Sequence, residues 1–297
     1  MTQNILVIGE TGQLARALKK EGRGQDLPLL FAGRGALNLS ASSQALRKKL
    51  MAYDDLGGII LAAAYTDVDG AETHEETAQT VNGIAPGIIA RFCAETDIPF
   101  VHVSTDYVFD GQGSSPYHPG DTTSPVNAYG RSKKVGELAV LSSRANAAIL
   151  RTSWLYDGTG KNFLTTMLNL AKSKDTVRVV SDQIGRPTFA LHLARACLAT
   201  LTALQKGGPM EPRLFHVTDS GDPTTWSGFA EFIFENARRF LPQVPVVEPI
   251  LSKDYPTPAK RPAYSVLDIS DYEEKISAAL PDWREGVRLA VLEYFSE

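Results

Sequence analysis

The sequence has few cysteines, no long apolar run and no excess of positive charge. Its two cysteines, Cys93 and Cys197, each lie in an apolar helical pattern, so we expect free thiols in a reducing cytoplasm and no disulfide. No apolar segment approaches the roughly 20 residues of a membrane span, and the N-terminal segment lacks the profile of a signal peptide. The net charge of −4 argues against a nucleic-acid-binding protein and against a basic membrane-surface protein. These absences predict a soluble, cytoplasmic protein.

A metal-ligand motif is also lacking. His74-Glu75-Glu76 begins like the zinc-protease motif, but position 78 is alanine, so the second histidine is missing. The five histidines are scattered along the chain. We therefore expect neither a structural nor a catalytic metal ion.

Short apolar segments alternate with helical segments through the first half of the sequence. Apolar runs typical of buried strands occupy residues 4–9, 29–32, 58–64, 100–104 and 147–152, and a further strand is expected at 214–217. Helical patterns occupy 14–20, 42–53, 72–95 and 132–143. This alternation predicts an α/β fold with a doubly wound parallel sheet that helices cover on both faces.

The pattern loosens past residue 155. Helices are expected at 163–173 and 189–204, on either side of the loop SDQIGRPT, and the stretch from Ser220 onward shows no strand–helix–strand rhythm. We predict a sheet domain over 1–156, with elements near 188–218 returning to it, and mainly a smaller substrate-binding lobe over 157–297. Ligands of open α/β sheets bind at the carboxyl edge of the strands, so we expect a cleft between the two parts.

The segment VIGETGQLARAL follows the first expected strand and opens the first helix. Gly9 and Gly12 have the spacing of a turn that cradles phosphate groups, since glycine lets the backbone bend sharply and lets a pyrophosphate approach the helix N-terminus. Ala15 stands in place of the third glycine and is still small enough for close helix packing. A plain glycine turn is the alternative, but the strand–helix context favours an NAD(P)-binding Rossmann domain.

The end of the second strand, FAGRGALNLS, is where the choice of dinucleotide is usually made. Arg34 stands there with no acidic residue nearby, and an arginine can pair with a 2′-phosphate. This favours NADPH and leaves NADH possible, while a solvated surface arginine remains the alternative. Small residues after the third strand, Ala62 to Ala64, offer a surface along which the nicotinamide ribose could lie.

The segment NAYGRSKK places Tyr129 and Lys133 four residues apart, so both side chains share one helix face. An ordinary amphipathic turn would give the same pattern. A lysine ammonium beside a phenol lowers its pKa from about 10 toward neutrality, which makes the phenol a usable proton donor to a carbonyl. The segment VHVSTDYVFDG adds a hydroxyl, Thr105, at the carboxyl end of a buried strand, where it would face the same cleft.

Eight ordered segments carry a family resemblance. They are GETGQL, AAAYTDVDGAE, VNGIAP, STDYVFDG, SPVNAYGRSKKVGE, ILRTSWLY, DQIGRPT and RPAYSVLD, and they run to about residue 268. The glycine turn and the Tyr-x-x-x-Lys pair are similar to the extended short-chain dehydrogenase/reductases, and the eight segments together resemble the dTDP-4-dehydrorhamnose reductases. The resemblance implies NAD(P)H-dependent reduction of the C4 keto group of dTDP-4-dehydro-L-rhamnose, which gives dTDP-L-rhamnose.

The resemblance also implies a role for each matched residue. Thr105, Tyr129 and Lys133 would be catalytic, with Tyr129 protonating the C4 oxygen as the cofactor delivers a hydride. The cofactor would contact Gly9, Thr11, Gly12, Gln13, Leu14, Arg34, Asn38, Leu39, Ala63, Ala64 and Tyr65, together with Tyr129 and Lys133. The dTDP-sugar would contact Val68, Asp106, Tyr107 and Trp154, together with Thr105 and Tyr129. Without the resemblance, Trp154 could equally be a core aromatic residue.

Two positions depart from the family pattern. Members usually carry an acid where Asn38 stands, so the adenosine contact differs here. Some dimeric members bind magnesium through interface glutamates, one of which would fall at Ala17. We therefore expect a monomer or a weak homodimer without a bridging magnesium ion.

Three other interpretations are distinguishable from the sequence. A reductase of another nucleotide-linked 4-keto-6-deoxy sugar stays open. A non-catalytic regulatory subunit of the same fold would not need Thr105, Tyr129 and Lys133 together. A 4,6-dehydratase would need a second acid after Thr105-Asp106, where this sequence has Tyr107.

Overall fold

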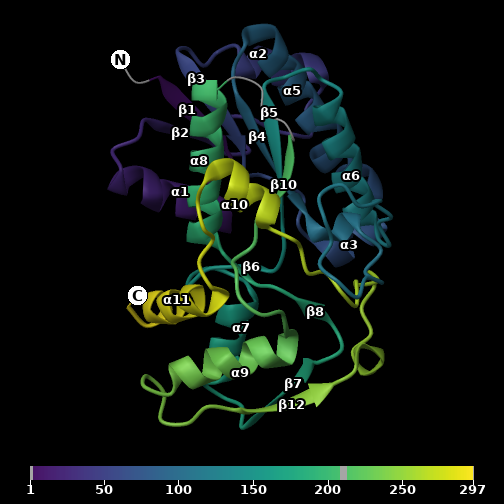
Figure 1. The fold of residues 1–297 in the computed structure, drawn as a ribbon, viewed down its shortest axis with the longest axis vertical. Helices are drawn as coiled ribbons and strands as arrows, with labels where there is room; N and C mark the ends of the chain where they lie inside the picture. The colour runs from purple at the N-terminus through teal and green to yellow at the C-terminus, as the bar shows by residue number, and fades with distance from the viewer. Residues whose placement is uncertain (1–2, 208–212, 297) are drawn as a thin grey trace.

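A six-stranded parallel sheet forms the centre of the fold in the computed structural model, which describes residues 3–207 and 213–296 (Figure 1). Its strands are β1 (Asn4–Ile8), β2 (Leu29–Ala32), β3 (Leu56–Leu61), β4 (Phe100–Thr105), β5 (Ala147–Thr152) and β10 (Leu214–His216). They lie in the order β2-β1-β3-β4-β5-β10. The predicted α/β fold and its strands are confirmed. The predicted domains also include residues 1–2, 208–212 and 297, which lie outside the described residues.

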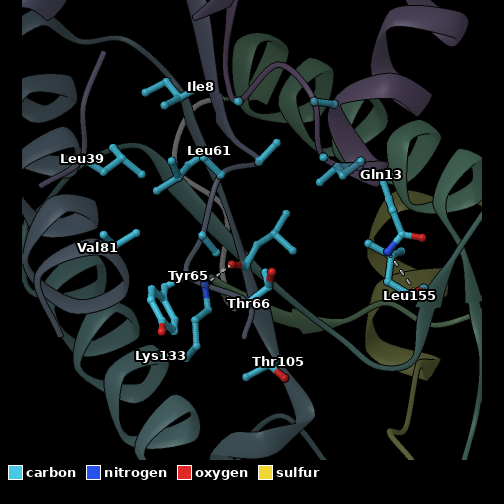
Figure 2. A pocket seen from close by; sticks show the side chains of 18 of the residues that line it. Ile8, Gln13, Leu39, Leu61, Tyr65, Thr66, Val81, Thr105, Lys133 and Leu155 are labelled. Carbon is cyan, nitrogen blue, oxygen red and sulfur yellow. Dashed lines mark hydrogen bonds between the residues drawn. The ribbon is translucent and has the colours of Figure 1, made fainter. Parts of the chain in front are cut away.

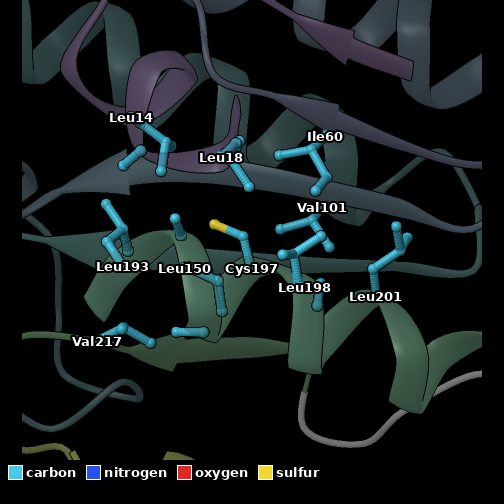
Figure 3. Packing of buried hydrophobic residues seen from close by; sticks show 14 of the residues in the cluster. Leu14, Leu18, Ile60, Val101, Leu150, Leu193, Cys197, Leu198, Leu201 and Val217 are labelled. Carbon is cyan, nitrogen blue, oxygen red and sulfur yellow. The ribbon is translucent and has the colours of Figure 1, made fainter. Parts of the chain in front are cut away.

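Helices cover both faces of this sheet. On one face lie α1 (Gln13–Gly24) and α8 (Ala190–Gly207), and on the other lie α2 (Ser43–Leu50), α5 (Ala85–Thr96) and α6 (Ala128–Leu141). Figure 3 shows Leu14 and Leu18 of α1 with Leu193 and Cys197 of α8 packed against Val101 of β4. Because both faces are covered, β3 and β5 are buried at every position, and this is why their sequences are almost continuously apolar.

The helical region predicted over 72–95 is divided into several elements. It consists of α3 (Val68–Thr73), α4 (Glu75–Ala78), a π-helix (Gln79–Ile84) and α5. Pro86 is the second residue of α5, which directly follows the π-helix, and the widened turn of the π-helix lies next to the position where the proline lacks an N–H group. The π-helix brings Asn82 inward, and its side chain accepts a hydrogen bond from Tyr65 N (2.8 Å) and donates one to Tyr65 O (2.9 Å).

A smaller lobe lies below the carboxyl edge of the sheet in Figure 1. It contains α7 (Phe163–Leu170), α9 (Trp226–Ala237), α11 (Trp283–Ser296) and a parallel pair formed by β7 (Thr176–Val180) and β12 (Val246–Ile250). A parallel pair that the sequence did not predict joins β12, which follows Ser220, to β7, which precedes it, and α9 packs on both strands. Its core is aromatic and includes Tyr156, Phe229 and Trp283.

Short elements connect the lobe to the sheet. Two-residue strands pair β6 (Leu155–Tyr156) with β9 (Thr188–Phe189) and β8 (Ile184–Gly185) with β11 (Thr224–Thr225), and short helices occupy Asp106–Val108, Ser252–Asp254 and α10 (Ser270–Ile276). Among the described residues, none of the helices is long and apolar enough to traverse a bilayer.

The strand order reverses beside β1, between β2 on one side and β3 on the other. In open parallel sheets such a switch point leaves a crevice at the carboxyl ends of the strands, where ligands bind. The loops that follow β1 and β3 meet at this point. The fold therefore brings the glycine turn and the segment Ala62–Tyr65 together.

Candidate active site

A cavity of about 900 Å³ lies at the carboxyl edge of the sheet. Figure 2 shows Thr105 and Lys133 at its lower end and Gln13 and Leu155 to the right. The cavity brings together every site residue predicted from the sequence: Gly9, Thr11, Gly12, Gln13, Leu14, Arg34, Asn38, Leu39, Ala63, Ala64, Tyr65, Val68, Thr105, Asp106, Tyr107, Tyr129, Lys133 and Trp154. These residues come from the ends of five strands, β1 to β5, and from α6, so segments far apart in the sequence share one cavity.

The glycine turn forms one end of the cavity. Gly9 has φ +130°, a conformation that side-chain-bearing residues rarely adopt, and a Cβ there would lie 3.1 Å from Ala63 N. Gly12 is the N-cap of α1, with no capping side chain, and no atom lies within 4 Å of the position its Cβ would take. The N–H groups at the start of α1 are thus free to meet an anion, as a dinucleotide pyrophosphate requires. The residues at this end fit a dinucleotide.

The adenosine side of the cavity differs from the sequence-based expectation. Arg34 is exposed and lines the cavity, and Asn38 Oδ1 accepts a hydrogen bond from Ser40 N (3.0 Å). The expectation that no acid lies near the end of β2 was wrong, because Glu10 reaches across from the β1 turn. A Cβ on Gly33 would lie within 3.3 Å of Glu10 Cβ and would overlap its carboxylate. This contact is not apparent from the sequence, because Glu10 and Gly33 are far apart along the chain and meet only since β1 and β2 are neighbours in the sheet.

The end of the cavity at Thr105, predicted to be catalytic, is buried and polar. Thr105 ends β4, and its hydroxyl donates a hydrogen bond to Asp106 Oδ1 (3.0 Å) and accepts one from Tyr107 N (3.2 Å). Asp106 is 2% exposed, and burial raises its pKa to about 7, although the hydrogen bond from Thr105 opposes the shift. The Asp106 carboxyl can therefore change its protonation state near neutral pH beside the Thr105 hydroxyl.

Tyr129 and Lys133 lie in the first turns of α6. Asn127 caps this helix by accepting a hydrogen bond from Gly130 N (2.8 Å). Gly130 has to be small, because a Cβ there would lie 2.1 Å from Tyr107 O. The start of α6 is thus held against the loop that carries Thr105, so that Tyr129 and Lys133 line the same cavity as this hydroxyl.

The expected effect of Lys133 on Tyr129 was wrong. The pKa of Tyr129 is raised, because burial disfavours the phenolate more than the Thr105 hydroxyl stabilises it. The Lys133 ammonium donates its hydrogen bond to Val103 O (2.7 Å), and burial lowers the pKa of Lys133 to about 8. A phenol with a raised pKa keeps its proton at neutral pH, which is the state that a general acid needs.

A buried ion pair that the sequence did not predict lies one turn beyond Lys133. Arg151 of β5 and Glu137 of α6 form two hydrogen bonds of 2.8 and 2.7 Å, and both side chains are 4% exposed. The Glu137 carboxylate also acts on Lys133, where its charge opposes the lowering of the pKa by burial. The pair fixes the register of α6 against β5. No sequence motif indicates this ion pair, because Arg151 and Glu137 lie on separate elements.

Aromatic residues line the part of the cavity predicted to bind the substrate. The ring of Tyr107 meets that of Tyr129 edge-on, with centroids 5.6 Å apart. Val68 begins α3, and the next residue, Asp69, forms an ion pair with Arg261 of the C-terminal segment (2.8 Å). Trp154 follows β5 and is half-buried, with one side in the aromatic core of the lobe and another lining the cavity. Trp154 thus belongs to the core of the lobe and to the wall of the cavity, and its contact with the dTDP-sugar stays a prediction.

The segment that follows Trp154 is linked to the glycine turn. Gln13 Nε2 donates a hydrogen bond to Leu155 O (3.3 Å), as Figure 2 shows. Arg16 donates to Thr11 O (2.5 Å) and forms an ion pair with Asp157 (2.6 Å). These contacts tie the cofactor end of the cavity to the start of the lobe. An arginine in a helix is too common a feature to have indicated them.

Metal ligands do not gather in the described part of the chain. Over residues 3–207 and 213–296, no three His, Cys, Asp or Glu side chains are grouped so that they could hold an ion. Ala17, where some family members carry a glutamate, is 8% exposed within α1.

Comparison with known proteins gives one consistent family. A family model described as RmlD substrate binding domain matches residues 3–295. The chain is 41% identical to the dTDP-4-dehydrorhamnose reductase of Burkholderia thailandensis, with 99% of each chain covered. It is 37% identical to the dTDP-4-dehydrorhamnose reductase of Salmonella typhimurium, with 99% of this chain and 98% of the relative covered.

Solved structures agree with this result. The dTDP-4-dehydrorhamnose reductase of Clostridium acetobutylicum superposes with a TM-score of 0.87 at 33% identity and covers 99% of this chain and 98% of its own. The enzyme of the same name from Bacillus anthracis, solved in complex with NADP, has a TM-score of 0.89 at 29% identity, with 99% and 100% covered.

Proposed function

Because the chain belongs to the RmlD substrate binding domain family, we propose that it is an NADPH-dependent oxidoreductase that reduces the C4 keto group of dTDP-4-dehydro-L-rhamnose to give dTDP-L-rhamnose. One observation supports the proposal most strongly. The Thr105 hydroxyl, the Tyr129 phenol and the Lys133 ammonium line one end of a cavity whose other end is a glycine turn at a helix N-terminus. This arrangement joins a proton donor to a dinucleotide site.

Three side chains, those of Thr105, Tyr129 and Lys133, have separate roles in the proposed reaction. NADPH, when bound, supplies a hydride to the C4 carbon of the sugar. Tyr129 donates its phenolic proton to the C4 oxygen, and its raised pKa means that the phenol carries this proton at neutral pH. Thr105 holds that oxygen through its hydroxyl. Lys133 would donate a hydrogen bond to the ribose at the nicotinamide end of the bound cofactor.

The remaining residues bind the two ligands. For the cofactor we assign Gly9, Thr11, Gly12, Gln13, Leu14, Arg34, Asn38, Leu39, Ala63, Ala64 and Tyr65, with Tyr129 and Lys133 at the nicotinamide end. For the dTDP-sugar we assign Val68, Asp106, Tyr107 and Trp154, with Thr105 and Tyr129 at the reacting carbonyl. The exposed Arg34 favours NADPH, and the adjacent Glu10 leaves NADH usable.

The larger-scale assignments are part of the same proposal. Residues 1–156 form the NAD(P)-binding domain, elements near 188–218 return to it, and 157–297 mainly form the lobe that selects the sugar nucleotide. The packing of α8 on α1 and of α9 on α11 in separate cores supports this division. The two buried free thiols support a location in a reducing cytoplasm. The buried Ala17 supports a monomer or weak homodimer without a bridging metal ion.

A substrate panel tests the proposed function. Oxidation of NADPH, followed by its absorbance, should require dTDP-4-dehydro-L-rhamnose and should be much slower with the UDP-linked analogue or with a dTDP-linked sugar that lacks the keto group. The product should be identified as dTDP-L-rhamnose by mass and NMR. If another nucleotide-linked keto sugar is preferred, the substrate assignment is wrong, and if none is reduced, the enzyme assignment is wrong.

A further inference from the structure

Trp154 and Trp226 form a parallel indole stack at the boundary between cavity and lobe. Their ring centroids are 3.6 Å apart and their planes differ by 10°. Trp154 lines the cavity, whereas Trp226 is the first residue of α9 and does not line it. Trp226 therefore contacts the site only through another side chain.

The backbone of Trp154 needs support. Its φ is +48°, in the left-handed region that a bulky residue seldom adopts, and such a conformation persists only where the surroundings hold it. Gly185 approaches the ring so closely that a Cβ there would lie 2.6 Å from Cε2 of Trp154. Gly185 of β8 pairs with Thr224 of β11, two residues before Trp226. This strand pair therefore fixes the positions of Gly185 and Trp226, two residues that contact the indole of Trp154. The indole of Trp154 is confined from these directions.

Trp226 is itself fixed in place. Its Nε1 donates a hydrogen bond to Gln183 Oε1 (3.1 Å), and Gln183 Nε2 donates to Ser252 Oγ (2.9 Å). Phe163 at the start of α7 packs on the ring of Trp226, with centroids 4.7 Å apart. The orientation of Trp226 is thus set by three separate segments of the lobe, around Phe163, Gln183 and Ser252.

We propose that Trp226 is a positioning residue of the sugar-nucleotide site, which holds the indole of Trp154 at the cavity wall. This inference rests on the proposed function, in which Trp154 contacts the dTDP-sugar. Because Trp226 covers one face of Trp154, the substrate meets only the remaining surface of that ring. Trp226 has no corresponding contact with the cofactor residues.

The stack has a spectroscopic signature that can be measured without substrate. Two stacked indoles at this separation interact electronically, so the circular dichroism of the aromatic region should contain a contribution from the pair that disappears when either ring is removed. This contribution is called the paired band below. The sequence has three tryptophans, and the third is a matched control. Trp283 is 2% exposed in the same lobe and meets Phe229 edge-on, but no stack with another tryptophan includes it.

The test uses the full chain with Trp226→Leu, Trp226→Phe and the control Trp283→Phe. Loss of one aromatic pair predicts a KM for the sugar nucleotide about 2- to 12-fold higher in Trp226→Leu, with kcat and the Kd for NADPH nearly unchanged. Trp226→Phe should recover much of the KM and still lose the paired band. Trp283→Phe should keep both the band and the KM, even if its melting temperature falls.

Gln183→Leu is the variant to use if Trp226→Leu does not fold, because it keeps both indoles and removes the hydrogen bonds of Gln183 to the indole N–H and to Ser252 Oγ. It should weaken the paired band and raise the KM by a smaller factor. The inference would be overturned if Trp226→Leu kept the wild-type KM, or if its affinity for NADPH fell by the same factor as its affinity for the sugar nucleotide. In either case the proposed function would still stand, as long as the wild-type protein reduces the keto sugar. If the wild-type protein neither binds dTDP-L-rhamnose in calorimetry nor reduces the keto sugar, the proposed function itself fails.

Discussion

The two ends of the cavity are built from different kinds of groups. At the cofactor end the backbone of Gly9 and Gly12 meets solvent-exposed side chains such as Arg34. At the catalytic end Asp106 and Lys133 are each 2% exposed, and burial shifts both of their pKa values toward the neutral range. Exposed groups and backbone amides can adjust affinity, whereas buried groups with shifted pKa values can carry proton transfer.

This difference teaches where variants should act. Substitutions at the buried end should change kcat and its pH dependence much more than they change the affinity for the cofactor. Substitutions at the exposed end should change the KM for the cofactor by small factors, because water screens the charges there. The five predictions that follow test this separation, from the largest expected effect to the smallest.

Removing the phenolic proton donor should have the largest effect. In Tyr129→Phe we expect kcat to fall by roughly 10²–10⁴-fold, the range for lost general acid catalysis, with the Kd for NADPH unchanged. Steady-state kinetics and calorimetry measure the two quantities. Tyr117→Phe is a suitable control, because that hydroxyl bonds Asp110 at 2.8 Å outside the cavity. Turnover near the wild-type rate in Tyr129→Phe would remove Tyr129 from the mechanism.

The ammonium of Lys133 should set the alkaline limit of activity. Its pKa of about 8 predicts that kcat/KM falls by about tenfold per pH unit above that value. Lys133→Arg should be slower but should lose this alkaline limb, because a guanidinium keeps its proton throughout the range. An unchanged limb in Lys133→Arg would assign the titration to another group.

The same pKa makes an opposite prediction for stability. A lysine whose folded pKa is lowered binds fewer protons in the native state than in the unfolded state, between about 8 and the ordinary value of about 10.4. In that window the contribution of Lys133 to the free energy of unfolding rises with pH. Activity should therefore fall above pH ~8 without a matching loss of thermal stability, and a parallel loss of both would point to unfolding.

Cofactor preference should respond to two opposite charges. Arg34→Ala should raise the KM for NADPH more than that for NADH, by up to about 5-fold, since an exposed ion pair contributes about 0.2–1 kcal/mol. Glu10→Gln should shift the preference in the other direction, because its carboxylate lies beside Gly33, where a 2′-phosphate would approach. Equal changes for both cofactors would show that neither side chain contacts the 2′ position.

The link between the glycine turn and the lobe should give the smallest effect. Asp157→Asn weakens the ion pair with Arg16, whose side chain is 36% exposed, so we expect the Kd for NADPH to rise by about 2-fold. A double-mutant cycle with Arg16→Gln isolates the pair, and its coupling energy should be below about 1 kcal/mol. A zero coupling energy would show that the lobe does not influence the cofactor loop through this contact.

The sheet and the cavity lining could be predicted from the sequence for a physical reason. Strands buried on both faces are almost continuously apolar, and residues that follow them necessarily meet at one edge, as Gly9, Ala63 and Thr105 do. The lobe lacks such a signal. Its β7–β12 pair joins distant segments, and both strands alternate or remain exposed on one side. Long-range pairings of this kind leave little pattern in either segment.

Contacts between elements account for the site features that were missed. Glu10 beside Gly33, Arg151 with Glu137, and Trp226 on Trp154 each join residues from different elements. The pKa of Tyr129 was mispredicted for the same reason. Helix spacing places Lys133 on the same helix face as Tyr129. Only the packing shows that the Lys133 ammonium bonds Val103 O and that burial has the largest effect on the pKa of Tyr129.

Transfer of deuterium from NADPH carrying a deuteride at the reactive position tests the central claim most directly. With dTDP-4-dehydro-L-rhamnose and the wild-type protein in a single turnover, we expect one deuterium at C4 of dTDP-L-rhamnose, detected by NMR and mass. Tyr129→Phe should bind the labelled cofactor normally and transfer little of the label in the same time. Deuterium at another carbon, or equal transfer by Tyr129→Phe, would contradict the account of the catalytic end.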